Sequence, residues 1–263
     1  MNVYLFELRR QARSFAVGCV VVAVLAAGLL AAAFPVYRDA QETVEGLLAG
    51  YPPEFLAAFG VVGDIFQFPG FFAFSYMYLA LAAAILGAAW GLSTFGRETR
   101  SRCAEFLFAR PVSRAGAFAA KLACCLTGVA VLGAVSVAVC AACASQVAPD
   151  VDAGRMVAAS CAIPGVALLF SGFGALLGVA SRRIRSVSGW ASGLGLIGFV
   201  LSSMPTLLDD DKLKAVSPFS YFDVARMLDE GSFDAGLLAL AACVVLACFG
   251  IALALYARRD VRA

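Results

Sequence analysis

The residues whose types and spacing could do chemistry gather in one segment, residues 96–114, which has the sequence GRETRSRCAEFLFARPVSR. If this segment is a helix, Glu98, Arg102 and Glu105 share one stripe, at spacings of four and three, where opposite charges can pair. Pairing of this kind stabilises a helix surface or binds a partner, and it breaks no covalent bond. The pattern therefore predicts an interaction surface.

The opposite side of the same helix is apolar. Cys103, Phe106 and Leu107 fall there, so the segment would be amphipathic and could rest on a membrane or in the groove of a partner protein. Pro111 should end the helix, and Arg114 begins the next one. A solvated basic loop without a partner is the alternative interpretation of these residues.

The residue types that are absent exclude several kinds of chemistry. The chain contains no histidine, which removes the commonest metal ligand and the usual proton-transfer group near neutral pH. An intramembrane protease built on a Ser-His pair or on histidine-bound zinc is therefore excluded. No G-x-x-x-x-G-K-[ST] motif occurs, so the chain cannot itself hold ATP in a P-loop. We expect no catalytic site, no bound cofactor and no metal site in this chain.

Two further motifs are better explained by packing. The sequence GLGLIG at 193–198 lies inside an apolar run without a preceding strand, which argues against dinucleotide binding. Cys140 and Cys143 form a C-x-x-C inside another apolar run with no histidine or carboxylate nearby. Glycines spaced by four predict close contact between helices at three places: Gly87 and Gly91, Gly174 and Gly178, and Gly189 and Gly193.

The composition identifies the elements that carry these residues. Hydrophobic residues make up 62% of the chain and charged residues only 14%, which is typical of an integral membrane protein. A membrane span needs about 20 apolar residues in a helix. Six uncharged runs of that length occur, at about residues 14–37, 71–95, 122–148, 157–181, 186–208 and 235–257. We therefore predict an all-α polytopic bundle with six transmembrane helices.

The basic residues predict the orientation of this bundle. The segments before, between and after the six spans alternate in their content of Lys and Arg, with 15 in one set and 5 in the other. By the positive-inside rule, both termini and the loop at 96–121 are cytoplasmic. We expect a multi-pass protein of the cell membrane, either a plasma membrane or a bacterial inner membrane.

The chain is predicted to be a single transmembrane domain over residues 1–263, with short amphipathic helices at the membrane surface. Eight of the nine cysteines lie in apolar runs and are expected to be small packing residues. The segments outside the spans include a cytoplasmic amphipathic lead-in at 1–13, an outer loop at 38–70 with a short helix from Pro52, the cytoplasmic loop at 96–121 and an outer segment at 209–234.

The cytoplasmic loop resembles the segment between the second and third spans of ABC-2 type transporter permeases, whose pattern is roughly R-E-x-x-x-G-T-x-E-x-L-L-x-x-P-V-S-R. The residues in register with it are Arg97, Glu98, Glu105, Phe106, Leu107, Pro111, Val112, Ser113 and Arg114. Arg102 and Cys103 depart from the pattern, because they stand where the family usually has Gly-Thr. PPEFLAAFG at 52–60, SPFSYFD at 217–223 and YARRD at 256–260 are similar to other family elements.

The resemblance implies that the loop is a coupling helix that docks on a separate cytoplasmic ATPase subunit. The ATPase-coupling residues would then be Arg97, Glu98, Arg102, Glu105, Phe106, Leu107, Pro111 and Arg114. It also implies that ATP and Mg²⁺ bind to the partner, and that a second permease, identical or different, completes the substrate path. Membrane lipid is the other expected contact, and nucleic acid is not expected.

Two other functions stay open at this point. An ion-coupled secondary transporter or a channel would normally keep ionisable residues inside its spans, and the six runs contain none. That absence favours an external source of energy. A membrane scaffold that anchors a partner without transport is the third possibility.

Overall fold

Six long helices make up most of the structure, a computed structural model that describes residues 3–52, 55–56, 60–61, 64–97, 114–181, 184–208 and 211–258. This described part of the chain contains helices and no strand. Six helical segments are long and apolar enough to cross a membrane: Val3–Asp39, Phe68–Phe95, Arg114–Val147, Ala153–Ala180, Val187–Pro205 and Ala235–Arg258. The predicted all-α bundle with six transmembrane helices is confirmed.

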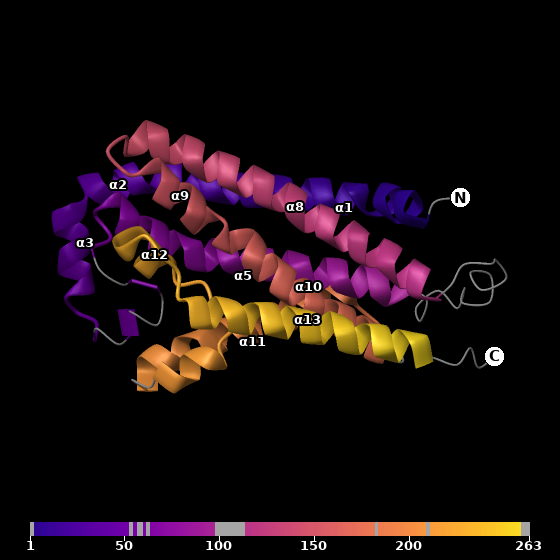
Figure 1. The fold of residues 1–263 in the computed structure, drawn as a ribbon. Helices are drawn as coiled ribbons and strands as arrows, with labels where there is room; N and C mark the ends of the chain where they lie inside the picture. Colours follow the sequence, from indigo (N-terminus) through magenta and orange to yellow (C-terminus); the bar gives the residue numbers. More distant parts are fainter. Residues whose placement is uncertain are drawn as a thin grey trace.

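Helix α5 (Phe68–Phe95) lies in the middle of the bundle (Figure 1). It is apolar around its whole circumference, which is typical of a helix surrounded by other helices. Its neighbours are α1 (Val3–Ala27), α8 (Arg114–Val147), α10 (Ala162–Ala180) and α11 (Val187–Leu208). The last helix, α13 (Ala235–Arg258), packs on α10 and α8.

Glycines permit the closest contact in the bundle, between α5 and α10. A Cβ atom at Gly87 would lie 2.1 Å from the carbonyl oxygen of Ala167, and one at Gly174 would lie 2.3 Å from that of Ala88. A Cβ atom at Gly91 would lie 2.3 Å from the carbonyl oxygen of Ser171, and one at Gly178 would lie 2.9 Å from the backbone nitrogen of Gly96. Because only glycine leaves room for this approach, two of the three predicted glycine pairs are confirmed as helix contacts.

The third predicted pair makes no such contact with the described part of the chain. A Cβ atom at Gly193 would meet no described atom within 4 Å, and one at Gly189 would meet only Ser186 of its own turn. Both glycines lie on a face of α11 that also exposes Trp190 and Ile197. The spacing alone could not distinguish a packed glycine pair from an exposed one.

The first span begins earlier than its apolar run. Helix α1 starts at Val3, so the expected lead-in is its first turns rather than a separate segment along the membrane. The helix continues through a π-helical stretch, Gly28–Ala33, into α2 (Phe34–Asp39). Pro35 lies in the first turn of α2 and cannot donate to the preceding turn, which accounts for the irregular backbone before it.

Cysteines of the described part carry free thiols and are not joined in disulfides. Cys140 and Cys143 are both buried in α8, as expected of small packing residues. Two others, Cys161 and Cys243, are exposed on the helix surface.

Both described ends of the chain lie at the same end of the bundle, because contacts join Glu7 to Arg97 and Arg114 to Ala257. We call this the inner end, after the sidedness that the basic residues predict. The short helices α3 (Gln41–Leu48), α9 (Ala153–Ser160) and α12 (Val224–Glu230) gather at the opposite, outer end (Figure 1). A turn begins at Pro52, where its carbonyl accepts from Phe55 and Leu56, and most of the helix predicted there lies outside the described residues.

Candidate functional site

Two of the eight predicted coupling residues, Arg97 and Arg114, belong to the described part of the chain. The other six lie outside it: Glu98, Arg102, Glu105, Phe106, Leu107 and Pro111. Their amphipathic arrangement therefore stays a prediction. The described part of the site lies at the ends of the two helices that flank the loop, α5 and α8.

The end of α5 is tied to α1 by a buried ion pair. The guanidinium of Arg97 donates to the carboxylate of Glu7, and the two side chains are 16% and 7% exposed. A carboxylate buried to this extent requires a charged or hydrogen-bonding partner, because it has lost its contact with water. Arg97, at the start of the loop, is the partner that this carboxylate requires.

One turn further along α1, the side-chain amide of Gln11 also contacts α5. Gln11 is 4% exposed, and its Nε2 donates to the hydroxyls of Ser93 and Thr94, each at 2.7 Å. Glu7 and Gln11 are four residues apart and thus lie on one face of the helix.

The third contact between α1 and α5 involves aromatic side chains. The indole Nε1 of Trp90 donates to the hydroxyl of Ser14 at 3.1 Å, and its ring meets Phe15 edge-on with centroids 4.9 Å apart. Residues of α1 thus pair with residues of α5 in reverse order, as two antiparallel helices require. The last two turns of α5 cannot shift against α1 without breaking these three contacts.

The start of α8 is held by a buried lysine. Lys121 is 1% exposed, and its Nζ donates to the carbonyl oxygen of Thr94 at 3.2 Å. The same ammonium lies 5.6 Å from the ring centroid of Tyr256 in α13, within range of a cation–π contact. One side chain thereby joins α8 to α5 and to α13.

Arg114, the first residue of α8, provides the other tie to α13. Its guanidinium donates to the carbonyl oxygen of Ala257 at 3.0 Å. The last carbonyls of a helix have no partner within the helix, so a nearby arginine satisfies one of them. Phe118 packs against Tyr256 one turn deeper, with ring centroids 5.7 Å apart.

We call this set the inner junction: Glu7, Gln11, Ser14, Trp90, Ser93, Thr94, Arg97, Arg114, Lys121 and Tyr256. It joins the two helices that flank the loop to the two terminal helices. Its contacts connect the two residues that flank the loop with four helices. In the part of the chain that the structure describes, no group of three or more His, Cys, Asp or Glu side chains could hold a metal ion.

Sequence reasoning included Arg97 and Arg114 but missed their partners. Glu7, Gln11 and Ser14 follow each other at spacings of four and three, and this polar stripe at the start of an apolar helix was the available signal. The helix predicted to begin at Arg114 is confirmed as α8, and it carries Lys121 toward the third span. Nothing in the local sequence indicated that this lysine is buried.

Comparison with protein families gives a match over most of the chain. The family model described as "Multidrug efflux system permease Rv1217c, C-terminal domain" matches residues 9–257. The match begins within α1 and ends within α13, so it reaches all six long helices. No curated protein and no solved structure matches the chain.

Proposed function

The chain belongs to this multidrug efflux permease family, and on that premise we propose that it is the membrane subunit of an ATP-driven ABC-2 type exporter. The family and the six long helices make it a multi-pass transporter permease. The proposal adds the energy source, the direction of transport and the location in the cell membrane.

The energy source is inferred from what the sequence lacks and from the pattern of its loop. The chain has no P-loop, so ATP and Mg²⁺ would bind to a separate ATPase subunit, and this chain would be no enzyme. The segment from Arg97 to Arg114 carries the pattern that resembles an ABC-2 coupling helix. An ion-coupled transporter is the alternative, and the apolar runs lack the ionisable residues that such transporters use.

The observation that carries the coupling proposal is that both ends of the loop are tied to other helices. Arg97 pairs with Glu7 of α1, and Arg114 donates to Ala257 of α13. A force applied to a loop with free ends would be lost in local motion. A force on this loop would instead move α1, α5, α8 and α13, and the glycine contact would carry the motion of α5 to α10.

A second permease, identical or different, would complete the transport path. Apolar side chains are exposed on several long helices, among them Val17, Val20 and Val24 of α1, Trp190, Ile197 and Val200 of α11, and Leu246 of α13. Such faces suit contact with lipid chains or with another subunit.

Purification in mild detergent from the native membrane tests the proposal. We expect a soluble P-loop protein to accompany the chain. Glu98→Ala and Arg114→Ala should each weaken that association by about tenfold, which is typical of charged residues at the centre of an interface. Arg38→Ala is the matched control, because it removes an exposed arginine at the outer end.

Two results would contradict the proposal. One is a purified chain that transports in vesicles without any ATPase, which would favour the ion-coupled alternative. The other is unchanged association and transport in both loop variants, which would show that the loop is only a solvated connection.

A further inference from the structure

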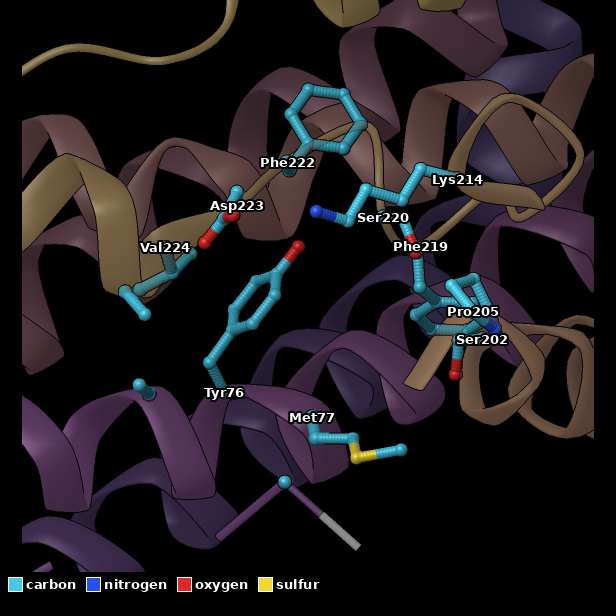
Figure 2. Close-up of a pocket in the computed structure, with 13 residues that line it drawn as sticks. Tyr76, Met77, Ser202, Pro205, Lys214, Phe219, Ser220, Phe222, Asp223 and Val224 are labelled. Atoms are coloured by element: carbon cyan, nitrogen blue, oxygen red, sulfur yellow. The ribbon is translucent and has the colours of Figure 1, made fainter. Parts of the chain in front are cut away.

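A pocket of about 220 Å³ lies at the outer end of the bundle, away from the inner junction. It is lined by α5, by α11 and by the segment that leads into α12 (Figure 2). Its walls combine apolar groups, among them Met77, Phe219 and Phe222, with the polar side chains of Tyr76, Lys214 and Asp223. Nothing in the proposed coupling mechanism uses these residues.

The hydroxyl of Tyr76 points into this pocket (Figure 2). The side chain is 7% exposed, and its hydroxyl has no hydrogen-bond partner among the described residues. Buried hydroxyls are normally hydrogen-bonded, because leaving one unpaired costs stability. An unpaired hydroxyl directed into a cavity therefore indicates a group that the cavity is built to receive.

Opposite charges flank this hydroxyl. Figure 2 shows the ammonium of Lys214 and the carboxylate of Asp223 directed toward the space in front of the Tyr76 hydroxyl. Asp223 Oδ1 also accepts from the backbone N–H of Arg226 at 3.1 Å. A ligand with a single charge would be attracted by one of the two groups and repelled by the other. A group that carries both charges matches the pair.

The apolar walls indicate what accompanies the charged group. Met77 is flexible and polarisable, and Phe219 and Phe222 offer large apolar faces. Tyr76 lies eight residues into α5, roughly 12 Å along the helix from its outer end. The pocket thus offers polar contacts and apolar contacts at a shallow depth of the outer side.

We propose that this pocket binds the zwitterionic head group of an amphiphile. Its anionic part is bound by Lys214 and by the hydroxyl of Tyr76, and its ammonium by Asp223. The first carbons of its apolar part lie against Met77, Phe219 and Phe222. This site goes beyond the coupling function, because binding here needs neither ATP nor an ATPase.

The first test measures binding to the purified full chain in detergent, with short-chain phosphatidylethanolamine as the probe. We expect saturable binding that Tyr76→Phe weakens by about tenfold, the effect of losing one hydrogen bond to a charged group. Ser75→Ala is the matched control. It removes a second buried hydroxyl without a described partner, from a residue that does not line the pocket. Absence of saturable binding, or equal affinity in Tyr76→Phe, would overturn the proposal.

The second test examines charge selectivity. Asp223→Asn keeps a side chain that can cap α12 but removes the negative charge. This variant should bind phosphatidylethanolamine less tightly and the anionic phosphatidylglycerol more tightly. Lys214→Gln should have the mirror effect, with tighter binding of a cationic alkylammonium amphiphile. Unchanged selectivity in both variants would overturn the proposal.

Mass spectrometry of the molecules released from the chain, purified from its own membranes, distinguishes two sources of this chemistry. A zwitterionic phospholipid identifies the bilayer as the source, and a soluble zwitterionic amphiphile identifies a transported cargo. Release of only singly charged or uncharged molecules would contradict the site. These assays use the chain without a partner, so a failure of ATP coupling would leave their outcome unaffected.

Discussion

The buried polar side chains of the inner junction and the buried hydroxyl at the outer pocket differ in whether they have partners. At the inner junction, Glu7, Gln11 and Lys121 are all nearly inaccessible, and each has a partner on another helix. At the outer pocket, the buried hydroxyl of Tyr76 has none among the described residues. Satisfied polar groups hold helices together, whereas an unsatisfied one leaves a position for something else. The inner end is thus suited to transmit force and the outer end to bind.

The largest expected effect comes from breaking the ion pair of the inner junction. Glu7→Ala leaves Arg97 largely buried without its carboxylate, which should lower the free energy of unfolding by about 3 kcal/mol. Titration with SDS in mixed micelles measures this change. Glu42→Ala on exposed α3 is the control and should have an effect within about 0.5 kcal/mol. Equal effects of the two variants would contradict the difference between buried and exposed carboxylates on which the junction depends.

The glycine contact between α5 and α10 should be the next most sensitive to substitution. Gly87→Ala places a methyl group against the Ala167 carbonyl and should cost about 1–3 kcal/mol. Gly193→Ala meets open space in a helix interior, so stability should stay the same or rise by up to about 1 kcal/mol. The same SDS titration compares them. A larger loss in Gly193→Ala would show that α11 is packed against another subunit.

A substitution in the outer pocket should change the free energy of unfolding in the opposite direction from one in the inner junction. Without ligand, Tyr76→Phe removes an unpaired buried hydroxyl, so the free energy of unfolding should stay the same or rise by up to about 1 kcal/mol. Unfolding of delipidated protein measures this. A marked loss of stability would mean that the hydroxyl has a structural partner, and the contrast between the two ends would disappear.

The smallest effect concerns a carboxylate at the outer end that does have partners. The pKa of Asp234 lies below its ordinary value because the backbone N–H groups of Leu237 and Gly236 donate to it, with Arg226 beside it. A lowered pKa in the folded state adds stability above the ordinary value of 3.8, and this contribution is lost as the pH falls through the lowered pKa. Asp234→Asn still caps α13 but does not titrate.

A pH series between about pH 5 and about pH 3 tests this, because wild type should lose more stability over that range than Asp234→Asn. Parallel curves for the two proteins would show that the contacts of Asp234 do not stabilise the folded state. The contribution should be small in either case, since the carboxylate is exposed to solvent.

Most of the fold followed from local pattern. Uncharged runs of membrane-spanning length identified the six helices, because a bilayer requires about 20 apolar residues from each. The glycine pairs of α5 and α10 were also visible as a spacing of four. The third pair shows the limit, since Gly189 and Gly193 have the same spacing but contact no other helix among the described residues.

The candidate site was only partly predictable. The charged loop stood out in an apolar chain, and its flanking residues Arg97 and Arg114 were selected for that reason. Their partners Glu7 and Ala257 lie about ninety and 143 residues away, and nothing in local spacing pairs such distant positions. Tyr76 gave no signal either, since it lies among phenylalanines in a helix that is apolar on every side.

The sequence by itself determined that this is a membrane protein with six helical spans and a charged loop, because length, hydropathy and charge are local properties. Only the tertiary structure decided which polar residues are satisfied. Tyr76 of α5 meets Lys214 and Asp223 of the segment before α12 at one pocket, whereas Glu7 and Lys121 meet partners at the other end. Burial and pairing depend on packing between helices, which no single helix encodes.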